Sequence, residues 1–146
     1  MKDYNTISSF KGEYAWLSNM QRIQPFWYGY LKFDSVECFY VAMKTTDIVE
    51  RAKISKMKPY EAKKYGRALS LRGDWDEIKL GVMKWGLKKK FSQPKFKDLL
   101  LATGNQEIIE GNTWGDTFWG VCNGVGENHL GKLLMEIREQ LKGEVK

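Results

Sequence analysis

Two acidic residues stand where a carboxylate could do chemistry. Glu37 lies at the start of a stretch with helical spacing, and Lys44, seven residues later, falls on the same helical face. Asp116 lies in a glycine-rich segment between two tryptophans, close to Trp119 and Gly120. Glycines permit close backbone approach, and an acid between two large rings is suited to holding a flat ring beside a charged group.

Each acid also has a structural explanation. Asp34 or Ser35 can cap the helix that contains Glu37, and Glu37 then fits the acidic arm of an arrangement resembling a capping box. Asp116 can form an Asx turn inside an aromatic cluster that pins its loop to the core. Spacing alone leaves both pairs of explanations open.

Other segments offer polar or aromatic groups with less local support. Ser18 and Asn19 stand at the end of an expected strand, where a turn is the alternative explanation. Residues 124–128, ending at Asn128, precede the last helix and could present backbone N–H groups to a phosphate. Trp75, between two aspartates, could begin a helix or supply a stacking plane.

The sequence contains few ligands for a transition metal. Cys38 and Cys122 are far apart, and His129 is the single histidine, so a zinc or iron site built on these residue types lacks ligands. We expect free thiols, no cofactor and no such metal site. A magnesium site made of carboxylates stays open, because oxygen ligands leave little trace in a sequence.

Length and composition predict one domain over residues 1–146. The chain has 146 residues, of which 42% are hydrophobic. Met1–Phe10 lacks the apolar block of a signal peptide, and no apolar run approaches the roughly 20 residues that span a bilayer. These features predict a cytoplasmic protein without a membrane partner. They say nothing of its oligomeric state.

Positive charge is concentrated in the middle of the chain. Residues 51–97 hold 15 lysines and arginines against four acids, a net charge of +11, whereas the whole chain carries +6. Such a block favours an anionic partner, namely a nucleotide, a phosphosugar or a nucleic acid. Solvated faces of lysine-rich helices are the alternative explanation.

The elements that must position these residues are predicted from periodicity. Helical spacing predicts helices over residues 34–43, 59–69, 76–91, 94–103 and 129–141, with Asn128 as a cap and Gly143 just past the end. Extended structure is expected over residues 13–17 and 24–33 and near 108–109, with a long loop over 111–127. The expected fold class is α+β, mostly helical with a small antiparallel sheet.

Ordered blocks of the sequence resemble the NADAR superfamily, also called YbiA-like, over about residues 8–141. The first blocks are Phe10, Gly12, 17–19, Val36-Glu37, Tyr40, Ala42, Lys44, Ala62, Trp75, Met83 and Lys90-Phe91. The later blocks are 108–110, Asp116, Trp119-Gly120 and the run 126–138, GENHLGKLLMEIR, which is highly specific as part of the ordered set.

The resemblance implies a YbiA-like fold and N-glycosidase chemistry on ribosylated nitrogen compounds. It assigns catalytic roles to Glu37 and Asp116, whose carboxylates would stabilise positive charge on the ribose and activate water in one cleft. Substrate binding is expected from a larger set, comprising Ser18, Asn19, Lys44, Trp75, Trp119, Gly120 and Asn128. Cys38 and Val41 replace the His and Gln that many members have after the glutamate and the tyrosine.

The family has two associated activities, and the sequence favours one. They are removal of ADP-ribose from modified guanine, as nucleoside or in DNA, and hydrolysis of phosphoribosylamino-pyrimidine intermediates of riboflavin biosynthesis. The positive charge exceeds what one phosphate demands, which favours ADP-ribosylated guanine. The expected partner is thus a phosphorylated ribose compound or an ADP-ribosylated nucleic acid. A silent module that only binds ADP-ribose, and a basic nucleic-acid-binding domain, are the alternatives of another class.

Overall fold

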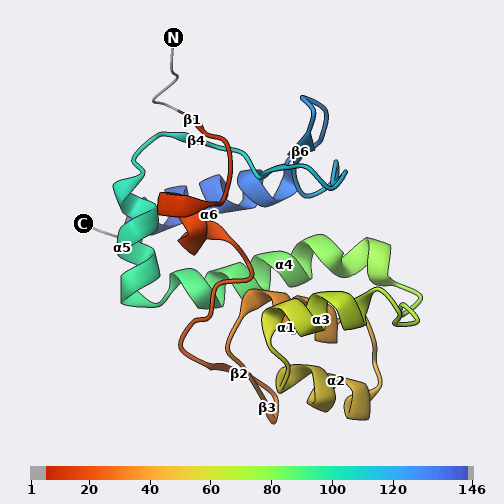
Figure 1. Cartoon of the computed structure of the whole chain (residues 1–146). Coiled ribbons are helices and arrows are strands. Elements are labelled where there is room, and N and C mark those ends of the chain that lie inside the picture. The colour runs from red at the N-terminus through yellow and green to blue at the C-terminus, as the bar shows by residue number, and fades with distance from the viewer. Residues whose placement is uncertain (1–5, 145–146) are drawn as a thin grey trace. The chain divides into compact units, whose positions relative to one another are not determined.

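The computed structural model describes residues 6–144 and divides them into two compact units (Figure 1). The central unit comprises residues 19–90, and the terminal unit comprises the described residues before 19 and after 90. Residues 1–5 of the stretch Met1–Phe10, which lacks the apolar block of a signal peptide, lie outside the described part of the chain. No helix within the described residues is long and apolar enough to cross a bilayer. The cytoplasmic location stays a prediction.

The central unit is a hairpin followed by four helices. Its elements are β2 (Phe26–Tyr28), β3 (Leu31–Phe33), α1 (Val36–Ala42), α2 (Ile48–Ser55), α3 (Pro59–Gly66) and α4 (Trp75–Phe91), of which the last residue belongs to the terminal unit. Strands β2 and β3 pair antiparallel, with Trp27 opposite Lys32. Gly29 turns the hairpin with a φ of +60°, which favours glycine.

Helix α1 forms the core of the central unit. Six of its seven residues are buried, and it packs against both α2 and α3. A Cβ on Gly66 would lie 3.0 Å from the Val41 side chain, so the glycine lets α3 approach α1 closely. A Cβ on Gly86 would lie 3.0 Å from the Phe39 ring, which gives α4 the same close approach. The predicted helical stripe of α1 is confirmed.

The terminal unit joins two helices with short strands. Its elements are β1 (Thr6–Ile7), the 3₁₀ helix η1 (Gly12–Leu17), α5 (Pro94–Ala102), β4 (Glu107–Ile108), β5 (Gly111–Asn112), β6 (Val121–Cys122) and α6 (His129–Glu144). Strand β1 pairs parallel with β4, and β5 pairs parallel with β6. Helix α6 packs on α5 and β4, which buries its predicted apolar face. The predicted α+β, mostly helical fold class is confirmed, and β2–β3 is its antiparallel sheet.

Several local predictions are wrong. Residues 13–17 belong to η1 and do not form a strand. Tyr14 and Trp16 alternate with other residues as in a strand, but they do not form a buried face, because Leu17 is the buried residue of η1. Helix α2 was not expected because it has no apolar stripe: Ile54 is buried, whereas Ile48 and Val49 are exposed and Asp47 caps the helix.

The other errors concern two helix ends and the segment 111–127. Gly143 lies inside α6 rather than past its end, and α3 ends at Gly66 instead of continuing to residue 69. The segment 111–127, expected to be a loop throughout, contains the short strands β5 and β6. Helix ends depend on capping and tertiary contacts more than on periodicity, which explains why the observed helix ends differ from the predicted ones.

Lys90 is buried, although the sequence suggested an exposed cation at the end of α4. Its side chain is fully shielded from solvent, and burial lowers the pKa of Lys90 to about 7. The unfolded chain keeps this ammonium near the ordinary lysine pKa of about 10.4. Between these two values the unfolded state binds more protons, so stability should rise with pH above about 7.

Lys90→Met is expected to flatten that pH dependence. Between about pH 7 and about pH 8.5 the wild-type free energy of unfolding should gain up to about 1.4 kcal/mol per pH unit from this group, and the variant should lack that gain. Urea unfolding at the two pH values measures both slopes. This range lies below the pKa of the Cys38 thiol, which burial raises to about 11. Equal slopes in the two proteins would contradict the prediction.

Candidate functional site

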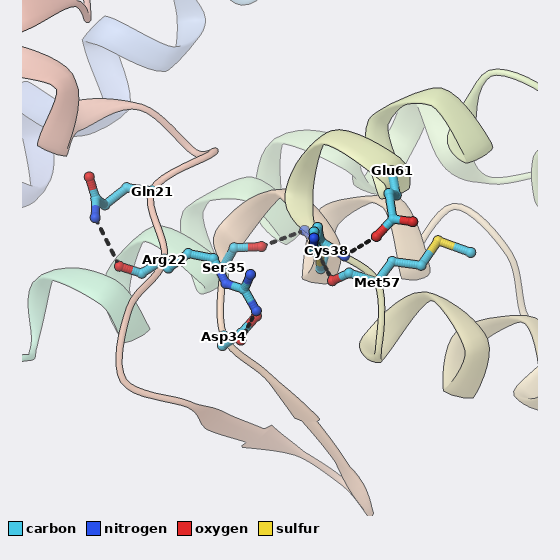
Figure 2. Close-up of polar contacts among 8 residues, drawn as sticks. Gln21, Arg22, Asp34, Ser35, Cys38, Met57 and Glu61 are labelled. Atoms are coloured by element: carbon cyan, nitrogen blue, oxygen red, sulfur yellow. Dashed lines mark hydrogen bonds and ion pairs between the residues drawn. The ribbon is translucent and has the colours of Figure 1, made fainter.

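Glu37 occupies the second position of α1, where the helix is capped by another residue. The Ser35 hydroxyl oxygen accepts a hydrogen bond from the Cys38 backbone N–H at 3.1 Å (Figure 2). A capping box would need an acid at the third helical position, which Cys38 occupies. The capping explanation for Glu37 therefore fails, because Ser35 performs that role without it.

Asn19 holds the backbone of Glu37. The Glu37 N–H donates to the Asn19 carbonyl oxygen at 3.1 Å, and the Asn19 side-chain amide donates to the Met83 sulfur at 3.4 Å. The side-chain oxygen of Asn19 is buried and has no hydrogen-bond partner. Because buried acceptors are normally satisfied, this oxygen is an exception within the central unit.

Lys44 lies two residues past the end of α1 and interacts electrostatically with Glu37. Burial lowers the pKa of Lys44, and the nearby Glu37 carboxylate acts in the opposite direction and raises it. The Lys44 ammonium lies 5.3 Å from the centre of the Tyr40 ring. A partly desolvated ammonium beside a carboxylate is suited to holding an anionic group next to a reacting carbon.

Trp75 begins α4 and packs on the same tyrosine. The centres of the Tyr40 and Trp75 rings are 5.0 Å apart, and Trp75 is only 5% exposed. The Arg72 backbone N–H donates to the Lys44 carbonyl oxygen at 2.8 Å, which ties the segment before α4 to the end of α1. The sequence left a helix start and a stacking plane open; Trp75 is the helix start, and its buried ring supports Tyr40.

Cys38 is a buried thiol beside Glu37. Desolvation by burial raises the pKa of Cys38 to about 11, and its Sγ–H donates to the Met57 carbonyl oxygen at 3.3 Å (Figure 2). A thiol held protonated in this way is neither a nucleophile nor a metal ligand. Cys38 and Cys122 are both free, as expected.

Asp116, in the terminal unit, forms the Asx turn that the sequence left open. Its Oδ1 accepts hydrogen bonds from the backbone N–H groups of Phe118, at 3.1 Å, and Trp119, at 2.9 Å. Asn112 fixes the same residue, because its side chain accepts from the Asp116 N–H and donates to the Asp116 carbonyl oxygen. The carboxylate is therefore held in one orientation and is half-buried.

The other predicted residues of this loop have structural partners. A Cβ on Gly120 would lie 2.0 Å from the Glu110 carbonyl oxygen, so the glycine is required by the packing of the loop. Asn128 accepts from the Glu110 N–H at 3.0 Å and donates to the Ile108 carbonyl oxygen at 2.9 Å. Trp119 is half-buried and packs edge-on against Phe118. Asn128 thus joins strand and loop through its side chain and does not cap α6 with it.

The structure brings together only part of the predicted set within each unit. Asn19, Glu37, Lys44 and Trp75 lie in the central unit, where Lys44 and Trp75 contact Tyr40 and Asn19 bonds to the Glu37 backbone. Asp116, Trp119, Gly120 and Asn128 lie in the terminal unit, as does Ser18. The predicted roles of these residues stay predictions. Sequence reasoning assigned no role to Met83, Glu110 or Asn112, which support the sites. Within residues 6–144 no three histidine, cysteine or acidic side chains form a metal-binding group.

The chain is similar in sequence to a protein family and to several known enzymes. The model of the NADAR domain matches residues 3–142. N-glycosidase Npun_R5314 of Nostoc punctiforme is 37% identical over 116 residues, which is 74% of this chain and 74% of that protein. N-glycosidase YbiA of Escherichia coli K12 is 40% identical over 110 residues, which is 72% of this chain and 68% of that protein.

A plant protein and a solved structure extend the comparison. Riboflavin biosynthesis protein PYRR of Zea mays is 35% identical over 132 residues, which cover 80% of this chain and only 21% of that longer protein. The NMR structure of E. coli YbiA superposes with a TM-score of 0.82 at 33% identity, over 96% of this chain and 87% of that one. The predicted YbiA-like fold and the predicted enzyme class, a hydrolase of N-glycosyl bonds, are confirmed by these relatives. The chain therefore belongs to the NADAR family.

Proposed function

We propose that the protein hydrolyses the C1′–N bond of a ribosylated nitrogen compound, and that its substrate is guanine carrying ADP-ribose. The observation that carries the proposal is the Glu37, Lys44 and Tyr40 cluster, in which a carboxylate on α1 interacts with a partly desolvated ammonium just past the end of that helix. Such a pair matches a substrate that has a phosphate near a carbon developing positive charge.

The chemistry assigns separate tasks to the two charges. As the C1′–N bond breaks, the leaving base takes the bonding electrons and the ribose carbon becomes electron-poor. The Glu37 carboxylate stabilises that charge or accepts a proton from the attacking water, whose oxygen forms the new bond to C1′. Lys44 holds a substrate phosphate. Asp116 is proposed as the second catalytic carboxylate. The proposed substrate-binding residues besides Lys44 are Ser18, Asn19, Trp75, Trp119, Gly120 and Asn128.

Positive charge supports ADP-ribose over a substrate with a single phosphate. A pyrophosphate brings two phosphate groups, and residues 51–97 carry a net charge of +11. The PYRR relatives support a second candidate, a phosphoribosylamino-pyrimidine of riboflavin biosynthesis. Both candidates present a phosphorylated ribose bonded to nitrogen, so the same carboxylate and ammonium serve either one.

A product assay separates the candidates. Purified protein is incubated with ADP-ribosylated guanosine and, separately, with the phosphoribosylamino-pyrimidine, and the released base is quantified by liquid chromatography. Release of guanine-containing product with little turnover of the pyrimidine is the expected result. The reverse preference would assign the riboflavin intermediate. Tight binding without product from either compound would indicate a module that only binds ADP-ribose.

Lys44 variants should change the pH profile of that reaction. Because burial lowers the pKa of Lys44, kcat/KM should fall as pH rises through a value below the ordinary lysine pKa of about 10.4. Lys44→Arg keeps its charge throughout this range and should lose the alkaline fall. Lys44→Met should raise KM about tenfold or more at neutral pH. If the wild type and Lys44→Arg have the same pH profile of kcat/KM, Lys44 does not bind the substrate phosphate.

A further inference from the structure

The hairpin β2–β3 and helix α4 carry exposed rings that the proposed chemistry does not use. Trp27 is 61% exposed, Tyr30 is 99% exposed, and Tyr28 and Trp85 are 39% and 37% exposed. Neighbouring large rings in contact with water mark a binding surface more often than an accident of packing. Tyr28 and Trp85 contact each other, and we call these two residues the aromatic surface. Trp27 lies on the opposite face of β2, because successive residues of a strand point to opposite sides.

A groove of about 450 Å³ lies beside this surface, within the central unit. The rings of Tyr28 and Trp85 meet edge to face with their centres 5.4 Å apart. Gly81 also lines the groove, and a Cβ added there would meet no atom within 4 Å. The groove is lined by Tyr28, Phe39, Met43, Glu77, Ile78, Gly81, Val82 and Trp85. It is an aromatic and aliphatic slot of a size that accepts a flat ring.

Lysines accompany the rings. The ammonium of Lys89 lies 4.9 Å from the centre of the Trp85 ring. The last part of α4, residues 81–91, contains no acid in its sequence, and three of its four lysines, Lys84, Lys88 and Lys89, are at least partly exposed, whereas Lys90 is buried. Glu77 is the acid on the groove wall, one helical turn before Gly81. Cations beside ring faces match a ligand in which flat bases alternate with phosphates.

The groove begins next to the proposed catalytic cluster. Met43, the C-cap of α1, follows Tyr40 by three residues, and Ile78 follows Trp75 by three residues on α4. Residues three apart on a helix are neighbours, so these two groove residues adjoin the Tyr40 and Trp75 rings. A strand that enters at this pair and continues along α4 would reach Trp85 and Lys89.

We propose that the aromatic surface and its groove bind unpaired bases of a single-stranded nucleic acid. The inference rests on the proposed function, because it makes these bases the neighbours of the modified guanine. Unpaired bases are required, since ring faces are hidden inside a duplex. The lysines favour nucleic acid over an apolar peptide. Each stacked base adds affinity that depends little on sequence, and the lysines add a salt-dependent part.

Binding of a short fluorescein-labelled oligodeoxythymidine, followed by anisotropy at about 50 and about 200 mM salt, tests the proposal. Gly81→Leu fills the groove while improving helix propensity, so this variant should fold and should bind at least about tenfold more weakly. Gly143→Leu is the matched control, because Gly143 also lies in a helix with open space around its Cβ. The control should bind as the wild type does.

A second comparison separates stacking from general attraction to positive charge. Trp85→Leu combined with Lys89→Ala removes one ring of the aromatic surface and the lysine beside it, and should weaken binding several-fold. Tyr60→Ala combined with Lys64→Ala removes an equivalent exposed pair on α3, where the ammonium lies 5.5 Å from the ring centre. Equal losses in the two double variants would overturn the proposal in favour of binding by the basic segment as a whole.

The outcomes are independent of the hydrolase assay. No binding by the wild type, or unchanged binding by Gly81→Leu, overturns the inference even if ADP-ribosylated guanosine is hydrolysed. Specific binding by the groove supports the inference even if no hydrolysis occurs, in which case the proposed function alone fails. When both hold, Gly81→Leu should turn over the modified nucleoside normally and lose efficiency only on the modified oligonucleotide.

Discussion

Glu37→Gln should fold as the wild type does and lose a factor on the order of 10² or more in kcat on ADP-ribosylated guanosine. Glutamine has nearly the same shape and preserves the backbone bond to Asn19, so the loss is confined to the negative charge. That charge is the one positioned to stabilise the electron-poor ribose. Removing it also deprives Lys44 of the interaction that raises its pKa.

Glu61→Gln is a matched control for this variant. Glu61 is also a glutamate in the first turn of a helix of the central unit, and its carboxylate accepts from the Lys58 backbone N–H at 3.0 Å. Its replacement should leave kcat unchanged and at most slightly lower the melting temperature. Full activity of Glu37→Gln under the same conditions would exclude Glu37 from the mechanism.

Asp116→Asn and Asp116→Ala should separate catalysis from loop support. Asparagine retains an oxygen that can accept from Phe118 and Trp119, so Asp116→Asn should keep the wild-type melting temperature and lose about 10²-fold in kcat. Asp116→Ala leaves those two N–H groups without their acceptor and should also be less stable, by about 1–3 kcal/mol. Calorimetry and single-turnover kinetics measure the two effects. Full activity of the asparagine variant with loss in the alanine variant would reduce Asp116 to a turn residue.

The double variant Glu37→Gln with Asp116→Asn tests whether the two acids act on one step. Residues that act as a unit are strongly non-additive, so the double variant should be scarcely slower than the slower single variant. Multiplication of the two single losses would instead assign the carboxylates to independent contributions. The comparison requires the same substrate and pH for all four proteins.

Periodicity was sufficient for the long helices and for the hairpin. The helix at residues 36–42, the start of α3 at Pro59, the extent of α4 and the start of α6 were predicted because apolar spacing reports directly which side of an element is buried. Helix α2 was missed for the same reason, because its exposed Ile48 and Val49 do not mark a face. Residues 13–17 were misread because a short run with alternating apolar residues fits a strand and a 3₁₀ turn equally well.

The sequence by itself determined the family and the identity of the candidate acids, since ordered motifs need only residue types and spacing. Tertiary structure decided what each acid is free to do. Ser35 rather than Glu37 caps α1, which separates the glutamate from the capping role, whereas Asp116 does form its Asx turn. Burial lowers the pKa values of Lys44 and Lys90. The sequence does not indicate this burial, because desolvation depends on neighbours that are remote in the chain.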